Sequence, residues 1–269
     1  MSVSRVPPIV TLTTDFGLAD HYVGTMKGVI LSRCPDARLV DISHEIPPFS
    51  IFSAAYTIDQ AAPYFPPGTV HLMVVDPGVG TARRALCAEA LGQIFVAPDN
   101  GVLSLIAARD AKLRARELAN PEWWLPSPSS TFHGRDIFAP AAAALASGSA
   151  KFEDAGPVIP DIEVWTDFAP TQTEPGVWRA HILSVDRFGN AITNLEARAF
   201  PHIANGLFTI EAGTQSVNTF SRTFGVATDG VCFAFFGSSG YIELGMNRQS
   251  AAETLGIAAG DAITLRIGR

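Results

Sequence analysis

The sequence is poor in cysteine and has no long hydrophobic run. Its three cysteines, Cys34, Cys87 and Cys232, are far apart, so neither a disulfide framework nor a Cys-x-x-Cys metal site is indicated. We interpret them as reduced packing residues. Hydrophobic residues make up 47% of the chain, but none of their runs reaches the roughly 18–20 residues that span a bilayer. We therefore expect no membrane segment.

Positive charge is also scarce. The chain has 19 Lys plus Arg against 26 Asp plus Glu, which gives a formal net charge of −7. Such a chain does not attract a phosphate backbone, so we expect no nucleic-acid partner. The N-terminal stretch MSVSRVPPIVTLTTDFG lacks the long apolar core of a signal peptide, which favours a cytoplasmic location.

Familiar nucleotide-binding and catalytic motifs are missing. No GxGxxG follows the first expected strand, and GxxxxGK[ST], GxSxG and HExxH do not occur. His44-Glu45 has no companion ligand at metal spacing. We therefore expect no dinucleotide or P-loop site, no serine hydrolase site and no bound metal.

The first part of the chain alternates between strand and helix patterns. Strand patterns lie at 9–13, 38–42, 69–75, 85–90 and 93–97, and helix patterns lie at 23–30, 51–58 and 135–147. This alternation predicts an α/β domain with a largely parallel sheet covered by helices.

The composition changes after about Gly148, where prolines interrupt a stretch without periodicity. Short strand patterns follow at 178–185, 191–194, 207–211, 231–236, 241–244 and 262–267. They predict a smaller all-β domain, either a barrel or a sandwich. We place an N-terminal domain at 1–165, a linker at 166–176 and the C-terminal domain at 177–269.

Two acidic residues directly follow expected strands, where an open α/β sheet binds ligands. They are Asp15 after IVTLTT and Asp76 after HLMVV. Asp76 opens the glycine-containing segment DPGVGTARR, which can return an arginine, Arg83 or Arg84, towards the carboxylate. Taken singly, a helix cap and a turn explain these two acids equally well.

His133 in TFHGRD precedes the expected Ala-rich helix, where a neutral histidine can simply satisfy backbone groups. The C-terminal half has polar loops with aromatic residues: DRFGN at 186–190, RTFG at 222–225 and SSGY at 238–241. Each is explained by a β-turn, but together they can bind an amino acid and stack on a purine.

Taken together, these segments resemble the SAM hydroxide adenosyltransferase family, which is related to the SAM-dependent fluorinase and chlorinase. The motifs that carry the resemblance are TLTTDFG at 11–17, VDPGVGTARR at 75–84, VAPDNGVLSL at 96–105, TFHGRD at 131–136, VDRFGNAITN at 185–194 and SSGYIELGMNR at 238–248. The resemblance implies an N-terminal α/β domain and a C-terminal β-barrel. It also implies a homotrimer with active sites between neighbouring subunits.

The resemblance further implies hydrolysis of S-adenosyl-L-methionine (SAM) to adenosine and L-methionine, with SAM as substrate and no cofactor. Asp76, Arg83 and His133 would position the attacking water. The implied substrate-binding residues are Asp15 for the ribose, Phe49 and Phe224 around the nucleoside, Asp186, Ser238 and Ser239 for the methionine end, and Asn190 with the backbone near Met246 and Arg248 for the adenine edge.

Two alternatives stay open at this point. The first is a SAM-dependent halogenase, although the halogenases of this family have an aromatic residue where Asp76 stands, and a carboxylate repels halide. The second is a non-catalytic adenosine or SAM sensor, which does not require the Asp, Arg and His set. Two positions depart from the family pattern: Gly237 replaces a frequent Asn, and Met246 replaces a smaller aliphatic residue.

Overall fold

The computed structural model describes residues 6–268. These residues divide into two compact units, and the boundary along the chain lies between Val164 and Trp165. The segment 166–176, expected as a linker, lies within the second unit. It contains β8 (Thr171–Glu174), which pairs antiparallel with β9 (Val177–Val185). The side chains of β8 are all exposed, so its sequence has no alternating apolar pattern that would reveal a strand.

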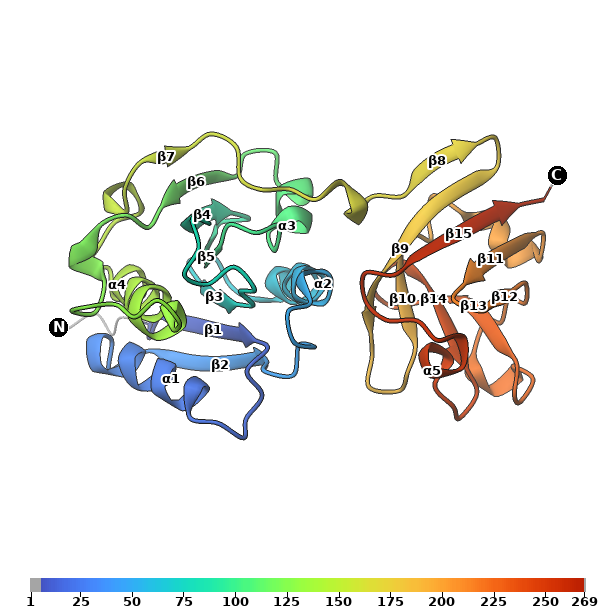
Figure 1. Cartoon of the computed structure of the whole chain (residues 1–269), viewed down its shortest axis with the longest axis horizontal. Coiled ribbons are helices and arrows are strands. Elements are labelled where there is room, and N and C mark those ends of the chain that lie inside the picture. The colour runs from blue at the N-terminus through green and yellow to red at the C-terminus, as the bar shows by residue number, and fades with distance from the viewer. Residues whose placement is uncertain (1–5, 269) are drawn as a thin grey trace. The chain divides into compact units, whose positions relative to one another are not determined.

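The first unit is a mixed α/β domain, as predicted (Figure 1). Its sheet has the order β2-β1-β3-β5-β4-β6-β7, in which β2-β1-β3-β5 are parallel and β5-β4-β6-β7 are antiparallel. The strand bounds are β1 (Ile9–Thr14), β2 (Arg38–Ser43), β3 (Val70–Val74), β4 (Ala85–Ala90), β5 (Gln93–Pro98), β6 (Arg114–Glu117) and β7 (Val158–Ile159). The strands β6 and β7 were not predicted, because three of the four residues of β6 are charged and β7 has only two residues.

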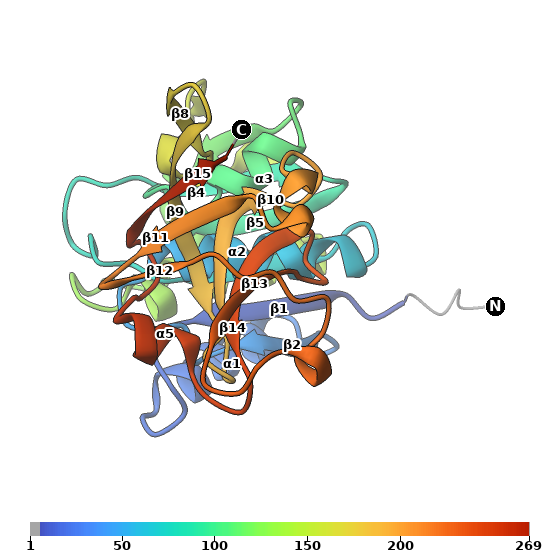
Figure 2. The ribbon, with the colours of Figure 1, turned by 90° about the vertical axis from the view of Figure 1, so that its right-hand side faces the viewer.

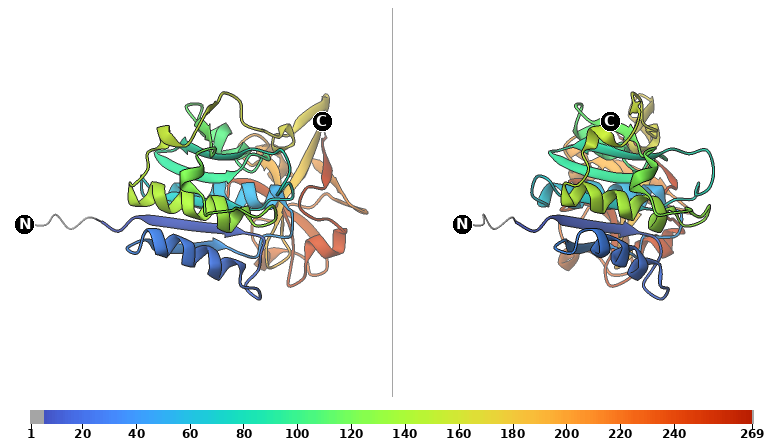
Figure 3. Two further views of the ribbon diagram at one scale, coloured as in Figure 1. Left: turned by 60° about the vertical axis from the view of Figure 1, so that its left-hand side comes forward. Right: turned by 90° about the vertical axis from the view of Figure 1, so that its left-hand side faces the viewer.

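Helices cover both faces of this sheet. Their bounds are α1 (Tyr22–Arg33), α2 (Ile51–Ala61), α3 (Ser104–Arg109) and α4 (Ala139–Ser147). The helices α1 and α4 pack against each other on one face, which is the near face in Figure 3, while α2 packs against α3. Because α4 is built mainly from alanine, it can approach the sheet closely.

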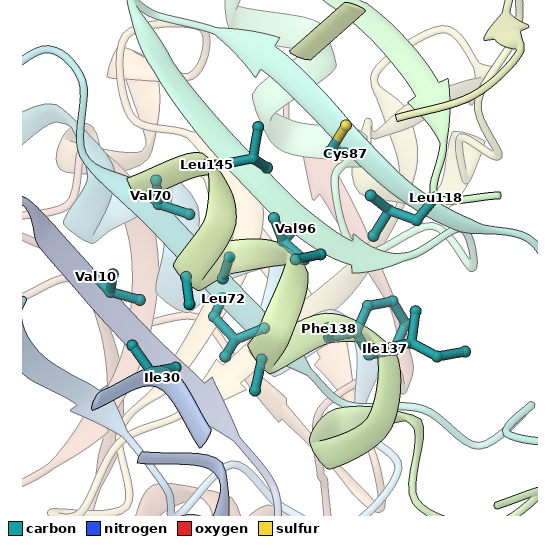
Figure 4. Close-up of a cluster of buried hydrophobic side chains, with 14 of the residues drawn as sticks. Val10, Ile30, Val70, Leu72, Cys87, Val96, Leu118, Ile137, Phe138 and Leu145 are labelled. Atoms are coloured by element: carbon teal, nitrogen blue, oxygen red, sulfur yellow. The ribbon is translucent and has the colours of Figure 1, made fainter. Parts of the chain in front are cut away.

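The core on this face joins alternate residues of the strands to the two helices. Val10, Leu72 and Val96 from the sheet meet Ile30 of α1 and Phe138 at the start of α4 (Figure 4). The intervening residues of the same strands, such as Thr11 and His71, point to the opposite face. The strands are therefore buried on both sides, which is typical of a parallel sheet.

The connections of the sheet determine where a ligand can bind. From β1 the chain passes through α1 to β2, and from β2 it passes through α2 back across to β3. The direction of winding changes between β1 and β3, so the crevice at their carboxyl ends is the expected binding position. Asp15 and Asp76 follow these two strands.

The second unit is a nearly closed antiparallel barrel, which confirms the all-β prediction (Figure 2). Of the two predicted alternatives, a barrel and a sandwich, the structure is the barrel. Its strand order is β12-β11-β15-β9-β10-β14-β13, and a bridge between Phe220 and Ala234 links the segment after β12 to β13. The further bounds are β10 (Ala191–Glu196), β11 (Phe208–Ala212), β12 (Gln215–Val217), β13 (Cys232–Phe236), β14 (Tyr241–Met246), α5 (Ala251–Leu255) and β15 (Ala262–Ile267). Ser250 caps α5 by accepting the Glu253 amide.

None of the three cysteines forms a disulfide, and Cys34 and Cys87 are buried in the core of the first unit. Within residues 6–268, no helix is long and apolar enough to cross a membrane.

Candidate active site

The loop after β3 brings Arg83 back to Asp76. Gly80 has φ +77°, and a side chain there would collide with the carbonyl oxygen of Ser130, so glycine is required. The Thr81 amide donates to the Gly78 carbonyl at 3.1 Å, which tightens the turn. At the start of the loop, Asn100 Nδ2 donates to the Val75 carbonyl at 3.0 Å. The loop is therefore held at its start and at its turn.

Arg83 binds Asp76 with two nitrogen atoms. Its Nε lies 2.9 Å from Oδ1 and its Nη2 contacts Oδ2. The two side chains are only 9% and 5% exposed, so this ion pair is largely shielded from solvent. The Arg83 guanidinium also lies over the Phe138 ring, 5.2 Å from its centroid.

Arg84 points elsewhere. Its Nε donates to Asp99 Oδ2 at 2.8 Å, and Asp99 Oδ1 accepts the Glu163 amide at 2.8 Å. The sequence left open which arginine faces Asp76, and the structure selects Arg83. Arg84 holds the segment at 161–163 instead.

His133 completes the group, which we call the Asp76 cluster (Asp76, Arg83 and His133). It directly precedes a π-helical turn, Gly134–Phe138, so the helix expected over 135–147 is α-helical only from Ala139. A side chain at position 134 would be tight against Met26, Phe132 and Val74. This close approach places His133 at the end of β3, and π-helical turns often occur at functional sites.

Arg83 Nη2 lies 2.9 Å from His133 Nδ1. A guanidinium can only donate, so Nδ1 accepts and the neutral imidazole carries its proton on Nε2. Burial, together with the positive charge of Arg83, lowers the pKa of His133 below its ordinary value. Near neutral pH the cluster therefore offers a carboxylate acceptor on Asp76 and an N–H donor on His133.

Asp15 lies at the end of the neighbouring strand. Its Oδ2 accepts the amide of Phe49 at 2.9 Å, and Phe49 has φ +66° and a side chain that is 70% exposed. Burial raises the pKa of Asp15, and the charge on Asp76 adds to this effect. The structure thus brings Asp15 and Phe49 together beside the Asp76 cluster.

In the second unit, Asp186 organises the loop between β9 and β10. Its Oδ1 accepts the amides of Phe188 and Asn190 at 2.9 and 2.8 Å, and its Oδ2 accepts Asn190 Nδ2 at 2.8 Å. Gly189 has φ +83° and packs against Ser250 so closely that no side chain fits. The carboxylate therefore fixes the orientation of the Asn190 amide.

This loop borders a cavity of about 510 Å³, which we call the barrel cavity. It is lined by Phe188, Asn190, Phe224, Met246, Asn247, Arg248, Gln249 and Ser250. A side chain at Gly245 would contact both Asn190 and Phe224, so this glycine lets the two approach β14. The three residues predicted for the adenine edge and Phe224, predicted to pack on the nucleoside, thus converge on one cavity, and an aromatic ring beside an amide suits a purine.

Ser238 and Ser239 lie in the turn between β13 and β14, outside the lining of this cavity. Ser239 Oγ lies 3.3 Å from Oε1 of Glu243, a buried residue that the sequence analysis missed. Burial raises the pKa of Glu243, and the charge on Asp186 adds to this effect. Any side chain at Gly237 would displace the Glu243 carboxyl group. Two features of the sequence point to this pair, namely the glycine at 237 and the acidic residue at 243.

Comparison with known proteins is decisive on the family. Residues 10–156 match the SAM hydroxide adenosyltransferase N-terminal domain, and residues 180–264 match the C-terminal domain of that family. The chain belongs to the SAM hydroxide adenosyltransferase family. The resemblance drawn from the six motifs is thereby confirmed.

Individual relatives match almost the whole chain. It is 42% identical over 261 residues to the (R)-S-adenosyl-L-methionine hydrolase of Thermus thermophilus, covering 94% of this chain and 97% of that protein. It is 28% identical over 293 residues to the fluorinase of Nocardia brasiliensis, covering 97% of each. A conserved protein from Thermotoga maritima has the same fold, with a TM-score of 0.83 and 35% identity over 96% of this chain and 99% of that one.

Proposed function

We propose that this enzyme hydrolyses S-adenosyl-L-methionine to adenosine and L-methionine. The observation that carries the proposal is the Asp76 cluster, in which a shielded carboxylate and a neutral histidine are joined by one arginine. The 42% identity to a hydrolase over nearly the full chain supports the same activity. Since that relative is named for the (R) form, we propose the (R) sulfonium epimer as the substrate.

The reaction requires one bond to form and one to break. The water oxygen attacks C5′, and the electron pair of the C5′–S bond goes to sulfur, which leaves as the neutral thioether of methionine. The attacking water loses one proton, which passes through Asp76 to solvent. A neutral leaving group needs no general acid, so positioning of the water dominates and can contribute about 7–11 kcal/mol in favourable cases.

The cluster suits this task. Asp76 Oδ1 is contacted by a single nitrogen of Arg83, which leaves it able to accept a hydrogen bond from the water. Arg83 holds the carboxylate in one plane, and His133 donates from Nε2 to the same water. The negative charge on Asp76 disfavours a halide at this position, which argues for hydrolysis over halogenation.

The remaining predicted residues would bind the substrate. Asp15 would accept the ribose hydroxyls, with Phe49 and Phe224 packing on the nucleoside. Asn190, Met246 and Arg248 would line the adenine position in the barrel cavity. Asp186, Ser238 and Ser239 would bind the methionine end.

We further propose a homotrimer in the cytoplasm, with active sites between neighbouring subunits and no requirement for a metal. Exposed aromatic side chains on each unit support assembly, since Phe49 and Phe188 are 70% and 80% exposed in the single chain. Analytical ultracentrifugation should give the mass of a trimer, cell fractionation should recover the protein in the cytosol, and activity should survive a metal chelator.

The test of the activity is incubation of the purified protein with SAM in chloride-free buffer made with oxygen-18 water, followed by mass spectrometry of the nucleoside. Adenosine carrying heavy oxygen at C5′ is the expected product. Separate incubations with the (R) and (S) epimers should show faster loss of the (R) form.

Intact SAM together with tight adenosine binding would instead indicate a sensor. Added chloride or fluoride that diverted the product to a 5′-halo nucleoside would indicate a halogenase. Either result would overturn the proposal.

A further inference from the structure

A buried threonine and histidine lie behind Asp15, and the proposed mechanism does not use them. Thr14 is the last residue of β1, and its Oγ1 lies 2.8 Å from Nδ1 of His44, which follows β2. Thr14 is 0% exposed and His44 is 4% exposed. The two side chains therefore join the ends of neighbouring parallel strands inside the protein.

On its other side, His44 faces a carboxylate. Its Nε2 lies 3.0 Å from Oδ1 of Asp41. Thr14 Oγ1 in turn accepts the Phe16 amide at 3.3 Å.

Asp41 also contacts a lysine side chain. Lys27 Nζ lies 2.6 Å from Asp41 Oδ2. Burial raises the pKa of Asp41, but hydrogen bonds from Lys27 and His44 outweigh it, so the pKa stays below its ordinary value. Asp41 thus remains ionised beside His44.

These contacts surround Asp15 on both sides. The Phe16 amide is fixed by the Thr14 hydroxyl, and the Gly17 amide donates to the His44 carbonyl at 2.8 Å. The Phe49 amide, from the loop that begins at His44, holds the Asp15 carboxylate at 2.9 Å. Loss of the Thr14 to His44 contact would release both the backbone after Asp15 and the loop that orients its side chain.

We propose that Thr14 and His44, supported by Asp41, are positioning residues that set the orientation of Asp15 for the ribose of the substrate. The inference rests on the proposed function. A carboxylate that accepts two neighbouring hydroxyls must keep its plane fixed, because each oxygen serves one hydroxyl. The Thr14 to His44 contact supplies this rigidity without touching the substrate.

The chain offers a matched control on the same strand. Thr11 Oγ1 lies 2.7 Å from Nδ1 of His71, and both residues are 0% exposed. Burial lowers the pKa of His71 to about 4, so it is a neutral partner of Thr11. Thr11→Val and Thr14→Val therefore remove equivalent buried hydrogen bonds from β1, one distant from Asp15 and one beside it.

The experiment compares the two variants by thermal melting, by calorimetric binding of adenosine, and by steady-state kinetics with SAM. Both should lower Tm by similar amounts. Only Thr14→Val should raise the adenosine Kd and the KM for SAM, by about tenfold, with kcat within about twofold of wild type. Thr14→Ser keeps the hydroxyl and should restore binding.

A double-mutant cycle separates positioning from general damage. In an Asp15→Asn background, Thr14→Val should cause no further loss of adenosine affinity, because the group it orients no longer has its charge. A Kd unchanged by Thr14→Val, an equal loss in Thr11→Val, or a full loss that persists without Asp15 would overturn the proposal.

If Thr14→Val does not fold, Asp41→Ala replaces it, since Asp41 lies at the surface end of the chain of contacts. It should raise the adenosine Kd about threefold, and an unchanged Kd would contradict the inference. Wild-type protein that neither binds adenosine nor hydrolyses SAM would overturn the proposed function itself, which is a distinct result.

Discussion

The two units hold their polar groups in different ways. In the first unit, charged side chains neutralise each other: Arg83 pairs with Asp76 in a setting that leaves both largely buried. In the second unit, the Asp186 carboxylate is satisfied by amides and lines up the loop at the barrel cavity. The first arrangement suits a step in which charge develops, and the second suits recognition of shape. We therefore expect substitutions in the Asp76 cluster to lower kcat and those around the barrel cavity to weaken binding.

The largest effect should come from Asp76. Asp76→Asn keeps the shape but removes the charge, so it should lower kcat about a thousandfold or more. Adenosine binding measured by calorimetry should change little. A turnover close to wild type would remove Asp76 from the mechanism and break the comparison between the units.

The second largest effect should come from Arg83. Arg83→Met should lower kcat about a hundredfold, because the Asp76 carboxylate loses its alignment. The adjacent Arg84→Met, which breaks the ion pair to Asp99, is the matched control and should alter Tm but not kcat. Equal losses of kcat in both variants would mean that the loop acts only as a scaffold.

Asp186 tests the second unit. Asp186→Ala should raise the KM for SAM about tenfold and leave kcat nearly unchanged, since the loop with Asn190 loses its anchor. Asp261→Ala removes a comparable side-chain acceptor for a loop amide, that of Ala258, and should leave KM unchanged. A drop in kcat without a change in KM would contradict the assigned role of Asp186.

The smallest expected effect is on the pH dependence of kcat, which tests His133 of the Asp76 cluster. Burial and the charge of Arg83 lower the pKa of His133, so the residue gains its proton only at a lower pH than an ordinary histidine does. Protonation places a hydrogen on Nδ1 that opposes Arg83 Nη2. A plot of kcat against pH should therefore show an acid limb whose midpoint lies below the ordinary histidine pKa of 6.5, and His133→Asn should remove this limb. A midpoint above 6.5 would contradict the lowered pKa.

Much of the fold could be predicted from sequence, because buried strands such as Ile9–Thr14 and Val70–Val74 are strongly apolar or β-branched. Strands without that pattern were missed. The exposed side chains of Thr171–Glu174 show no apolar period, and their strand character depends on pairing with β9. The π-helical turn before α4 depends on close packing around Gly134, which no local pattern encodes.

The candidate site could be predicted only as a set of residue types. Sequence placed Asp76 and an arginine on one loop, but the choice between Arg83 and Arg84 depends on Asp99, which lies on a different segment. In the sequence, His44 stands out only as a possible metal ligand, and it has no companion ligand at metal spacing. Its contact with Thr14 joins residues 30 positions apart and follows from the parallel pairing of β1 with β2.

The close approach of Gly237 to Glu243 constrains how this chain can change over evolutionary time. Any larger residue at 237 would displace the Glu243 carboxyl group, whereas a shorter residue at 243 would leave Gly237 undisturbed. The two substitutions are therefore epistatic, and their order matters. A lineage that gains an asparagine at 237 passes through a less perturbed intermediate if position 243 changes first.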